Sequence, residues 1–115
     1  MQRRFRLTRS DDINRVRQEG RSLANATLVL GFLPNQINQT RIAVIAGRSI
    51  GGAVQRNLAK RRIRSAFQAL HMGLNQGYDL VLIARKPILQ VDYQNVVNGL
   101  HALLIQAGLM KDVQH

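Results

Sequence analysis

Apolar positions along the chain follow two different spacings. Within residues 54–74 and again within residues 96–107 they recur every three or four positions, which predicts two amphipathic helices. A shorter helix is predicted to begin with Ser10 as its N-cap, to carry two acids in its first turn and to end at Gly20. Asp92 is the predicted N-cap of the last helix.

Short apolar runs without helical spacing predict β-strands. Residues 23–33 form one β-prone segment, and the polar stretch from Pro34 to Thr40 is predicted to make a hairpin connection to the next strand. Residues 41–46 and 78–84 are apolar on both faces, which favours central places in a sheet. The order helix, strand, strand, long helix, strand, helix is typical of a small α/β sandwich, with part of the sheet left uncovered.

Length and composition narrow the class of protein. We expect one domain over residues 1–115, with a basic arm at residues 1–9 and a frayed tail at residues 109–115. The chain has no cysteine, its apolar runs are too short to span a bilayer, and its basic N-terminus lacks the apolar stretch of a secretory signal. We therefore expect a cytoplasmic protein. The net charge of +11 is typical of nucleic-acid-binding proteins, although basic membrane-surface proteins and toxins share it.

The long helix is predicted to carry a cationic stripe. Its polar residues at helical spacing are Arg56, Asn57, Lys60, Arg61 and Arg64. The residues predicted to face the core are Ala59, Ile63, Ala66, Phe67, Leu70 and Leu74. No acid occurs between Glu19 and Asp79, whereas a merely solvated helix face usually mixes charges of both signs. We therefore expect a polyanion to bind the stripe, and we expect Arg48 in the preceding loop to extend the same surface. Arg62 lies on the opposite polar edge of the helix. For this residue, contact with RNA and exposure to solvent stay equally open.

Residues able to catalyse a reaction are few. His71, His101 and His115 have no metal-binding spacing, and we expect the first two to be surface residues. Ser49 and Ser65 have no sequence indication of an activating base, and the glycines near residue 51 match no phosphate-binding loop. Catalysis by the protein's own side chains is therefore not expected.

The segment RIAVIAGRSIGGAVQRNLAKRRIRSAF at residues 41–67 resembles the signature region of bacterial ribonuclease P protein subunits. In that family a strand leads through a basic, glycine-containing loop into a helix bearing R-N-R-x-K-R-x-x-R. The matching residues are Gly51, Ala53, Val54, Arg56, Asn57, Lys60, Arg61, Arg64, Ala66 and Phe67. The resemblance extends to residues 6–9 and 78–87, and it departs at Leu58, where the family usually has a second arginine.

This resemblance implies a fold and a function. The fold would be a two-layer α/β (α+β) sandwich like ribosomal protein S5 domain 2, in the order α-β-β-(β)-α-β-α with a left-handed βαβ crossover. The protein would be a subunit of an endoribonuclease that removes the 5′ leader of precursor tRNA. Its partners would be the catalytic RNA and precursor tRNA, with no membrane and no protein partner required. Mg²⁺ would be held mainly by the RNA, which would also supply the catalytic groups.

The resemblance further implies a cleft for the single-stranded leader, beside the first helix. The residues that would form it are Arg9, Ile13, Val16, Arg17 and Val29. The family has aromatic residues where this chain has Ile13, Arg17 and Gly31, so leader binding would depend more on backbone charge. Core packing of the aliphatic residues and solvent exposure of Arg17 remain the alternative.

Two other functions fit parts of the pattern. A general or ribosomal-type RNA-binding protein on the same fold would share the basic composition, but the loop, helix and strand motifs together favour the ribonuclease P subunit. A DNA-binding regulator would need a short helix and a turn before the basic helix, where this chain has a strand and a glycine loop.

Overall fold

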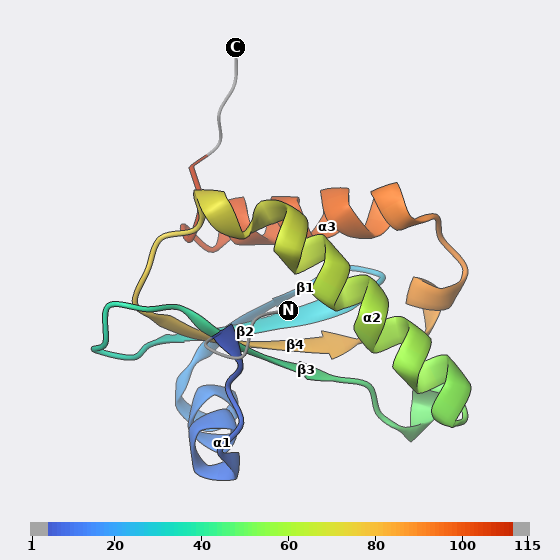
Figure 1. Ribbon diagram of the computed structural model, residues 1–115, viewed down its shortest axis with the longest axis horizontal. Helices are drawn as coiled ribbons and strands as arrows, with labels where there is room; N and C mark the ends of the chain where they lie inside the picture. The colour runs from blue at the N-terminus through green and yellow to red at the C-terminus, as the bar shows by residue number, and fades with distance from the viewer. Residues whose placement is uncertain (1–4, 112–115) are drawn as a thin grey trace.

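The computed structural model describes residues 5–111 and contains one four-stranded sheet with helices on both faces (Figure 1). The strands are β1 (Arg21–Ala24), β2 (Leu28–Pro34), β3 (Arg41–Ile45) and β4 (Tyr78–Ala84). The helices are α1 (Ser10–Glu19), α2 (Ala53–Leu70) and α3 (Tyr93–Gln106), with short 3₁₀ turns η2 (Arg48–Ile50), η3 (His71–Gly73) and η4 (Lys86–Leu89). Helices α2 and α3 cover one face of the sheet and α1 lies on the other. No helix within the described range is long and apolar enough to cross a membrane.

The segment predicted as one strand over residues 23–33 is in fact a hairpin of β1 and β2. The Asn25 side chain breaks the segment, because its Oδ1 accepts hydrogen bonds from the Thr27 and Leu28 backbone N–H groups at 2.9 and 3.0 Å. Such a turn made by an asparagine side chain reverses the chain without glycine or proline. Ala24 then pairs with Val29, so that β1 and β2 run antiparallel.

The strand order is β1-β2-β4-β3, which corrects two predictions. The connection between β2 and β3 is not a hairpin, because β4 lies between these strands, antiparallel to β2 and parallel to β3. Strand β3 lies at the edge rather than in the centre of the sheet. Its edge is partly covered by the N-terminal arm, where the Leu7 N–H donates to the Ile42 carbonyl at 2.6 Å. This cover and the helices on both faces explain why β3 is apolar after Arg41.

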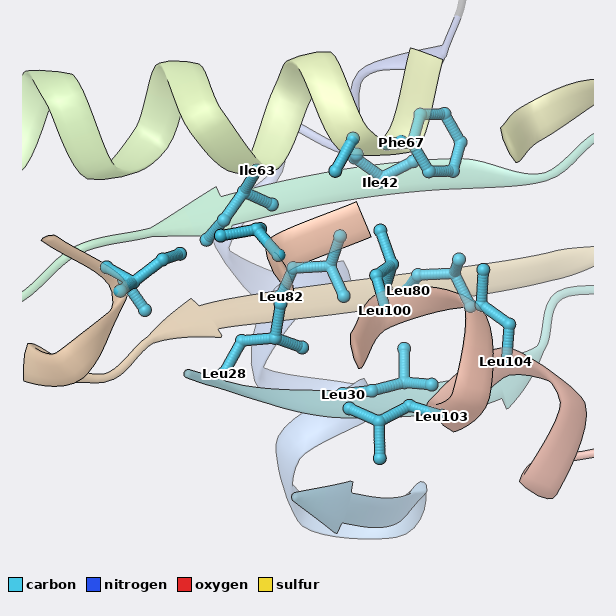
Figure 2. Close-up of a cluster of buried hydrophobic side chains, with 14 of the residues drawn as sticks. Leu28, Leu30, Ile42, Ile63, Phe67, Leu80, Leu82, Leu100, Leu103 and Leu104 are labelled. Atoms are coloured by element: carbon cyan, nitrogen blue, oxygen red, sulfur yellow. The ribbon is translucent and has the colours of Figure 1, made fainter. Parts of the chain in front are cut away.

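The main core lies between the sheet and the helices α2 and α3 (Figure 2). Its strand residues include Leu28, Leu30, Ile42, Leu80 and Leu82, and its helix residues include Ile63, Phe67, Leu100, Leu103 and Leu104. The predicted core-facing set of α2 is confirmed, although the helix ends at Leu70 and Leu74 is buried just beyond it. A smaller core under α1 contains Leu7, Val16, Ala43 and Val81.

Helix ends agree with the sequence in part. The Asp92 carboxylate accepts the Asn95 N–H at 2.8 Å, as predicted. The N-cap residue of α1 is Arg9 rather than Ser10, and it makes no side-chain cap. Gly20 ends α1 as predicted, and glycine is needed there because a Cβ would come within 2.4 Å of the Val16 carbonyl oxygen.

The prediction of a frayed tail from residue 109 is wrong for its first two residues. Leu109 and Met110 are buried, and the Leu109 carbonyl accepts the Asn75 N–H at 2.8 Å. Residues 112–115 of the predicted tail, like residues 1–4 of the arm, lie outside the described residues. The predicted fold class is confirmed: the molecule is an α/β sandwich of the ribosomal protein S5 domain 2 type, with β3, α2 and β4 forming the left-handed crossover.

Candidate nucleic-acid interface

The cationic stripe of α2, defined as Arg56, Asn57, Lys60, Arg61 and Arg64, lies on the helix away from its buried residues. Asn57 and Arg61 are exposed, and the other three side chains are half-buried. Half-burial of long basic side chains places their aliphatic stems along the protein and leaves their charged ends in solvent. A shallow hollow of about 510 Å³ is lined by Asn57, Arg61, Arg64, Ser65 and Gln68. The structure therefore brings the predicted RNA-contacting residues of α2 onto one surface.

The charges of this stripe are not neutralised within the described part of the chain. The ion pairs found among residues 5–111 join Arg15 and Arg41 to Asp12 and Asp79, which lie around α1 and the start of β3 and β4. None of them includes a residue of α2. The stripe therefore presents a positive potential that an external polyanion can neutralise.

The loop before α2 adds to this potential. Arg48 is exposed in η2, next to Ile50, which is buried and anchors the loop. Gly51 has φ of 141°, a conformation that residues with a side chain rarely adopt. Helix α2 begins after Gly52 without a side-chain cap and without an acid in its first turn, so the positive end of the helix dipole is not offset locally.

Arg62 does not belong to this surface. Its Nη1 donates to the carbonyl oxygens of Ile88 and Val91, at 2.8 and 2.5 Å. These bonds attach α2 to the segment that precedes α3. The sequence left contact with RNA and exposure to solvent open for Arg62. The structure shows neither, because the side chain binds the protein's own backbone.

Four of the five residues predicted to hold a leader are divided between two hollows, one on the α1 side of the sheet and one along the edge of β3. Val16, Arg17 and Val29 line a hollow of about 160 Å³, together with Gly20, Ser22, Gly31, Val81 and Ile83. Val16 is only 1% exposed and is mainly a core residue, as the alternative reading holds. A Cβ on Gly31 would lie 3.5 Å from Val16 Cγ1, so the missing side chain at Gly31 leaves this hollow open.

The other two residues predicted for the leader lie elsewhere. Ile13 lines a neighbouring hollow of about 240 Å³ along the edge of β3, which also includes Arg6, Thr8 and Arg64. Arg64 thereby connects the stripe of α2 with the arm and α1. Arg9 is exposed at the N-cap of α1 and lines neither hollow.

A buried ion-pair cluster is the main feature that sequence reasoning missed. Asp79 is 0% exposed, and Arg41 donates to both of its carboxylate oxygens at 2.9 Å, while Asn35 donates to Oδ1 at 2.9 Å. The hydrogen bond to Asp79 raises the pKa of Arg41, so this guanidinium stays charged. Arg15 and Asp12 of α1 approach the pair at 3.8 Å. The cluster therefore attaches α1 to the sheet, and no sequence spacing indicates it because Arg41 and Asp79 meet only through the register of β3 and β4.

Comparison with known proteins agrees with the motif. The family model described as Ribonuclease P matches residues 1–108. The ribonuclease P protein component of Chloroflexus aurantiacus is 39% identical over 111 residues, covering 96% of this chain and 82% of the relative. That of Symbiobacterium thermophilum is 37% identical over 112 residues, covering 96% of this chain and 97% of the relative.

Solved structures agree in fold. The RNase P protein of Staphylococcus aureus superposes with a TM-score of 0.83 at 28% identity, covering 93% of this chain and 98% of that one. The RNase P protein of Thermotoga maritima gives a TM-score of 0.80 at 31% identity, covering 88% of this chain and 96% of that one. The family match extends over nearly the whole chain, and relatives agree with it in both sequence and fold. The chain therefore belongs to the ribonuclease P protein family.

Proposed function

We propose that this chain is the RNA-binding protein cofactor of a bacterial ribonuclease P. In this proposal the stripe of α2 and Arg48 bind the catalytic RNA, and the hollow beside α1 helps to hold the 5′ leader of precursor tRNA. The observation that carries the proposal is the cationic stripe, which makes no ion pair among residues 5–111, on a helix whose other face is fixed in the core. Family membership supports the assignment to ribonuclease P.

The chemistry of the stripe suits an RNA backbone. Arg56, Lys60 and Arg64 stand at helical spacing with Arg61 beside them, so that four cations can reach successive phosphates. Asn57 can donate to and accept from a base edge or a ribose hydroxyl. In the free protein these like charges repel one another, and bound phosphates would relieve that repulsion.

Removal of the leader would depend on Mg²⁺ held by the partner RNA. Two of the chain's carboxylates, those of Asp12 and Asp79, are poorly suited to hold the metal, because they are paired with arginines. Among residues 5–111 no three histidine or acidic side chains gather as a metal site would need. The protein would act by holding both RNAs together, which lowers the Mg²⁺ concentration needed for cleavage by neutralising phosphates that otherwise repel one another.

The α1 side would contribute more modestly to leader binding. Val16 and Val29 offer an apolar floor to the hollow, and Arg17 at its rim can pair with a phosphate or stack on a base. Since the lining residues include no aromatic side chain, backbone charge would supply most of the affinity for the leader.

The experiment that tests this function is cleavage of a precursor tRNA by the cognate catalytic RNA at limiting Mg²⁺, with and without the protein. We expect the protein to restore cleavage, and we expect the triple variant Arg56→Gln, Lys60→Gln, Arg64→Gln to fail. The matched control is Arg21→Gln, Lys86→Gln, Lys111→Gln, which removes the same charge from exposed residues outside α2 and should restore cleavage. Tight RNA binding without restored cleavage would instead indicate a general RNA-binding protein.

A further inference from the structure

A separate hollow of about 360 Å³ lies at the C-terminal end of α2. It is lined by Phe5, Asn38, Gln39, His71, Met72 and Gln76. These residues come from the N-terminal arm, the loop between β2 and β3, and the segment around η3. The end of α2 and the loop between β2 and β3 lie at the same end of the molecule (Figure 1). Neither the cationic stripe nor the hollow beside α1 includes any of these residues.

Aromatic rings form one wall of this hollow. The His71 ring lies 5.2 Å from the ring of Phe5 and 6.1 Å from that of Phe67, measured between centroids. Phe67 is 1% exposed in the main core and holds the other two rings in place. A flat surface that is fixed before binding loses little entropy when a ligand stacks on it. His71, which we expected to be a plain surface residue, is therefore part of an ordered aromatic group.

The remaining lining residues suit the same kind of ligand. Met72 is 87% exposed, and its thioether can pack against the face or edge of an aromatic ring. Asn38 and Gln76 supply amide groups. The Gln76 amide is oriented at both ends, because the Thr40 N–H donates to its Oε1 at 3.0 Å and its Nε2 donates to the Leu74 carbonyl at 3.5 Å. A nucleobase combines two flat faces with an edge of donors and acceptors, and such bases are bound by stacking plus amide hydrogen bonds.

The hollow at the C-terminal end of α2 lies in line with the cationic stripe of the same helix. His71 follows Arg64 by seven residues and keeps helical backbone angles, so it continues the same side of α2. An RNA strand whose phosphates follow the stripe therefore reaches this hollow at the end of the helix. We propose that the hollow is a stacking pocket for one unpaired nucleotide of the RNA that binds α2. This inference rests on the proposed function, since it needs RNA along α2.

Nuclear magnetic resonance of the full chain with labelled methionine methyl groups tests the pocket. The probes are the single-stranded RNA hexamer rA₆ and a hexamer of the same backbone without bases. We expect the ring current of a stacked base in rA₆ to move the Met72 methyl signal and the abasic hexamer to leave it nearly unchanged. Met110, which is buried, reports whether the fold itself has changed. Equal shifts with both hexamers would overturn the proposal, because phosphates alone would then account for binding.

Variants test the same pocket on the catalytic RNA. His71→Ala and Met72→Ala should each weaken binding roughly fivefold or more, as loss of one stacked base does, with an unchanged dependence on salt. His101→Ala is the matched control on α3 and should bind as the original chain does. If both pocket variants bind normally while the triple variant of the stripe does not, the pocket is refuted and the proposed function stands. If the stripe variant also binds normally, the proposed function fails.

Discussion

Individual charged residues in this molecule differ in whether they already have a partner. Arg41 binds Asp79 through two hydrogen bonds, whereas Arg61 is exposed and makes no ion pair within the described range. The pKa of Arg41 is higher in the folded protein than in the unfolded chain. The ion pair therefore contributes its full stability at any pH below the unfolded pKa, and this contribution is lost only as the pH rises through the folded pKa. The pair therefore remains intact at neutral pH.

We predict that Arg41→Ala destabilises the protein by about 3 kcal/mol, because it leaves the buried Asp79 carboxylate with only the exposed Arg15, at 3.8 Å, as a charged partner. The free energy of unfolding, measured with urea at neutral pH, checks this. Arg61→Ala removes the same kind of side chain from an exposed site and should change stability by no more than about 0.5 kcal/mol. Similar losses in the two variants would show that the ion-pair cluster has no special role.

At the scale of elements, α1 and the sheet enclose a hollow that a glycine leaves open. Gly31 of β2 faces Val16 of α1, and a Cβ there would make only ordinary contacts. The backbone of Gly31 is extended within β2 and does not need glycine. A larger side chain at this position would therefore enter the hollow without straining the strand.

Gly31→Tyr should strengthen binding of a leader-bearing precursor tRNA by roughly 1–3 kcal/mol, because it adds one ring on which a base can stack. The comparison is between the affinities of the holoenzyme for precursor tRNA and for mature tRNA without a leader. Only the affinity for precursor tRNA should rise. An equal change for both RNAs would mean that the hollow beside α1 does not contact the leader.

How far the elements could be predicted depends on how local their causes are. The stripe and core face of α2 follow from the spacing of residues along one helix, and the structure agrees with them. The split of β1 from β2 depends on a single side chain, Asn25, whose turn the surrounding apolar residues conceal. The prediction of a central position for β3 is wrong, because its apolar residues are covered by α1, α2 and the arm rather than by neighbouring strands on both sides. Contacts between distant segments, including the Arg41–Asp79 pair and the contact of Phe5 with His71, have no local signal.

For the molecule as a whole, the net charge of +11 makes RNA binding strongly dependent on salt. If about five phosphates are neutralised, the logarithm of the affinity should fall against the logarithm of salt concentration with a slope of roughly −3.5 to −4.5. Lys60→Gln should reduce the size of this slope by about one unit. Fluorescence anisotropy of labelled catalytic RNA across a KCl series measures both values, with Lys86→Gln as the control. Lower affinity of Lys60→Gln with an unchanged slope would contradict a phosphate contact.

The two faces of the sheet differ in how strongly they are charged. Helix α2 on one face has five basic residues and no acid, while α1 on the other face has three acids against two basic residues. This separation gives the molecule a permanent electric dipole along the direction from α1 to α2. The field of a polyanion exerts a torque on such a dipole, so the protein turns its α2 face toward RNA before the two touch. Orientation during approach then shortens the search for the productive encounter, a gain in association rate that added salt removes.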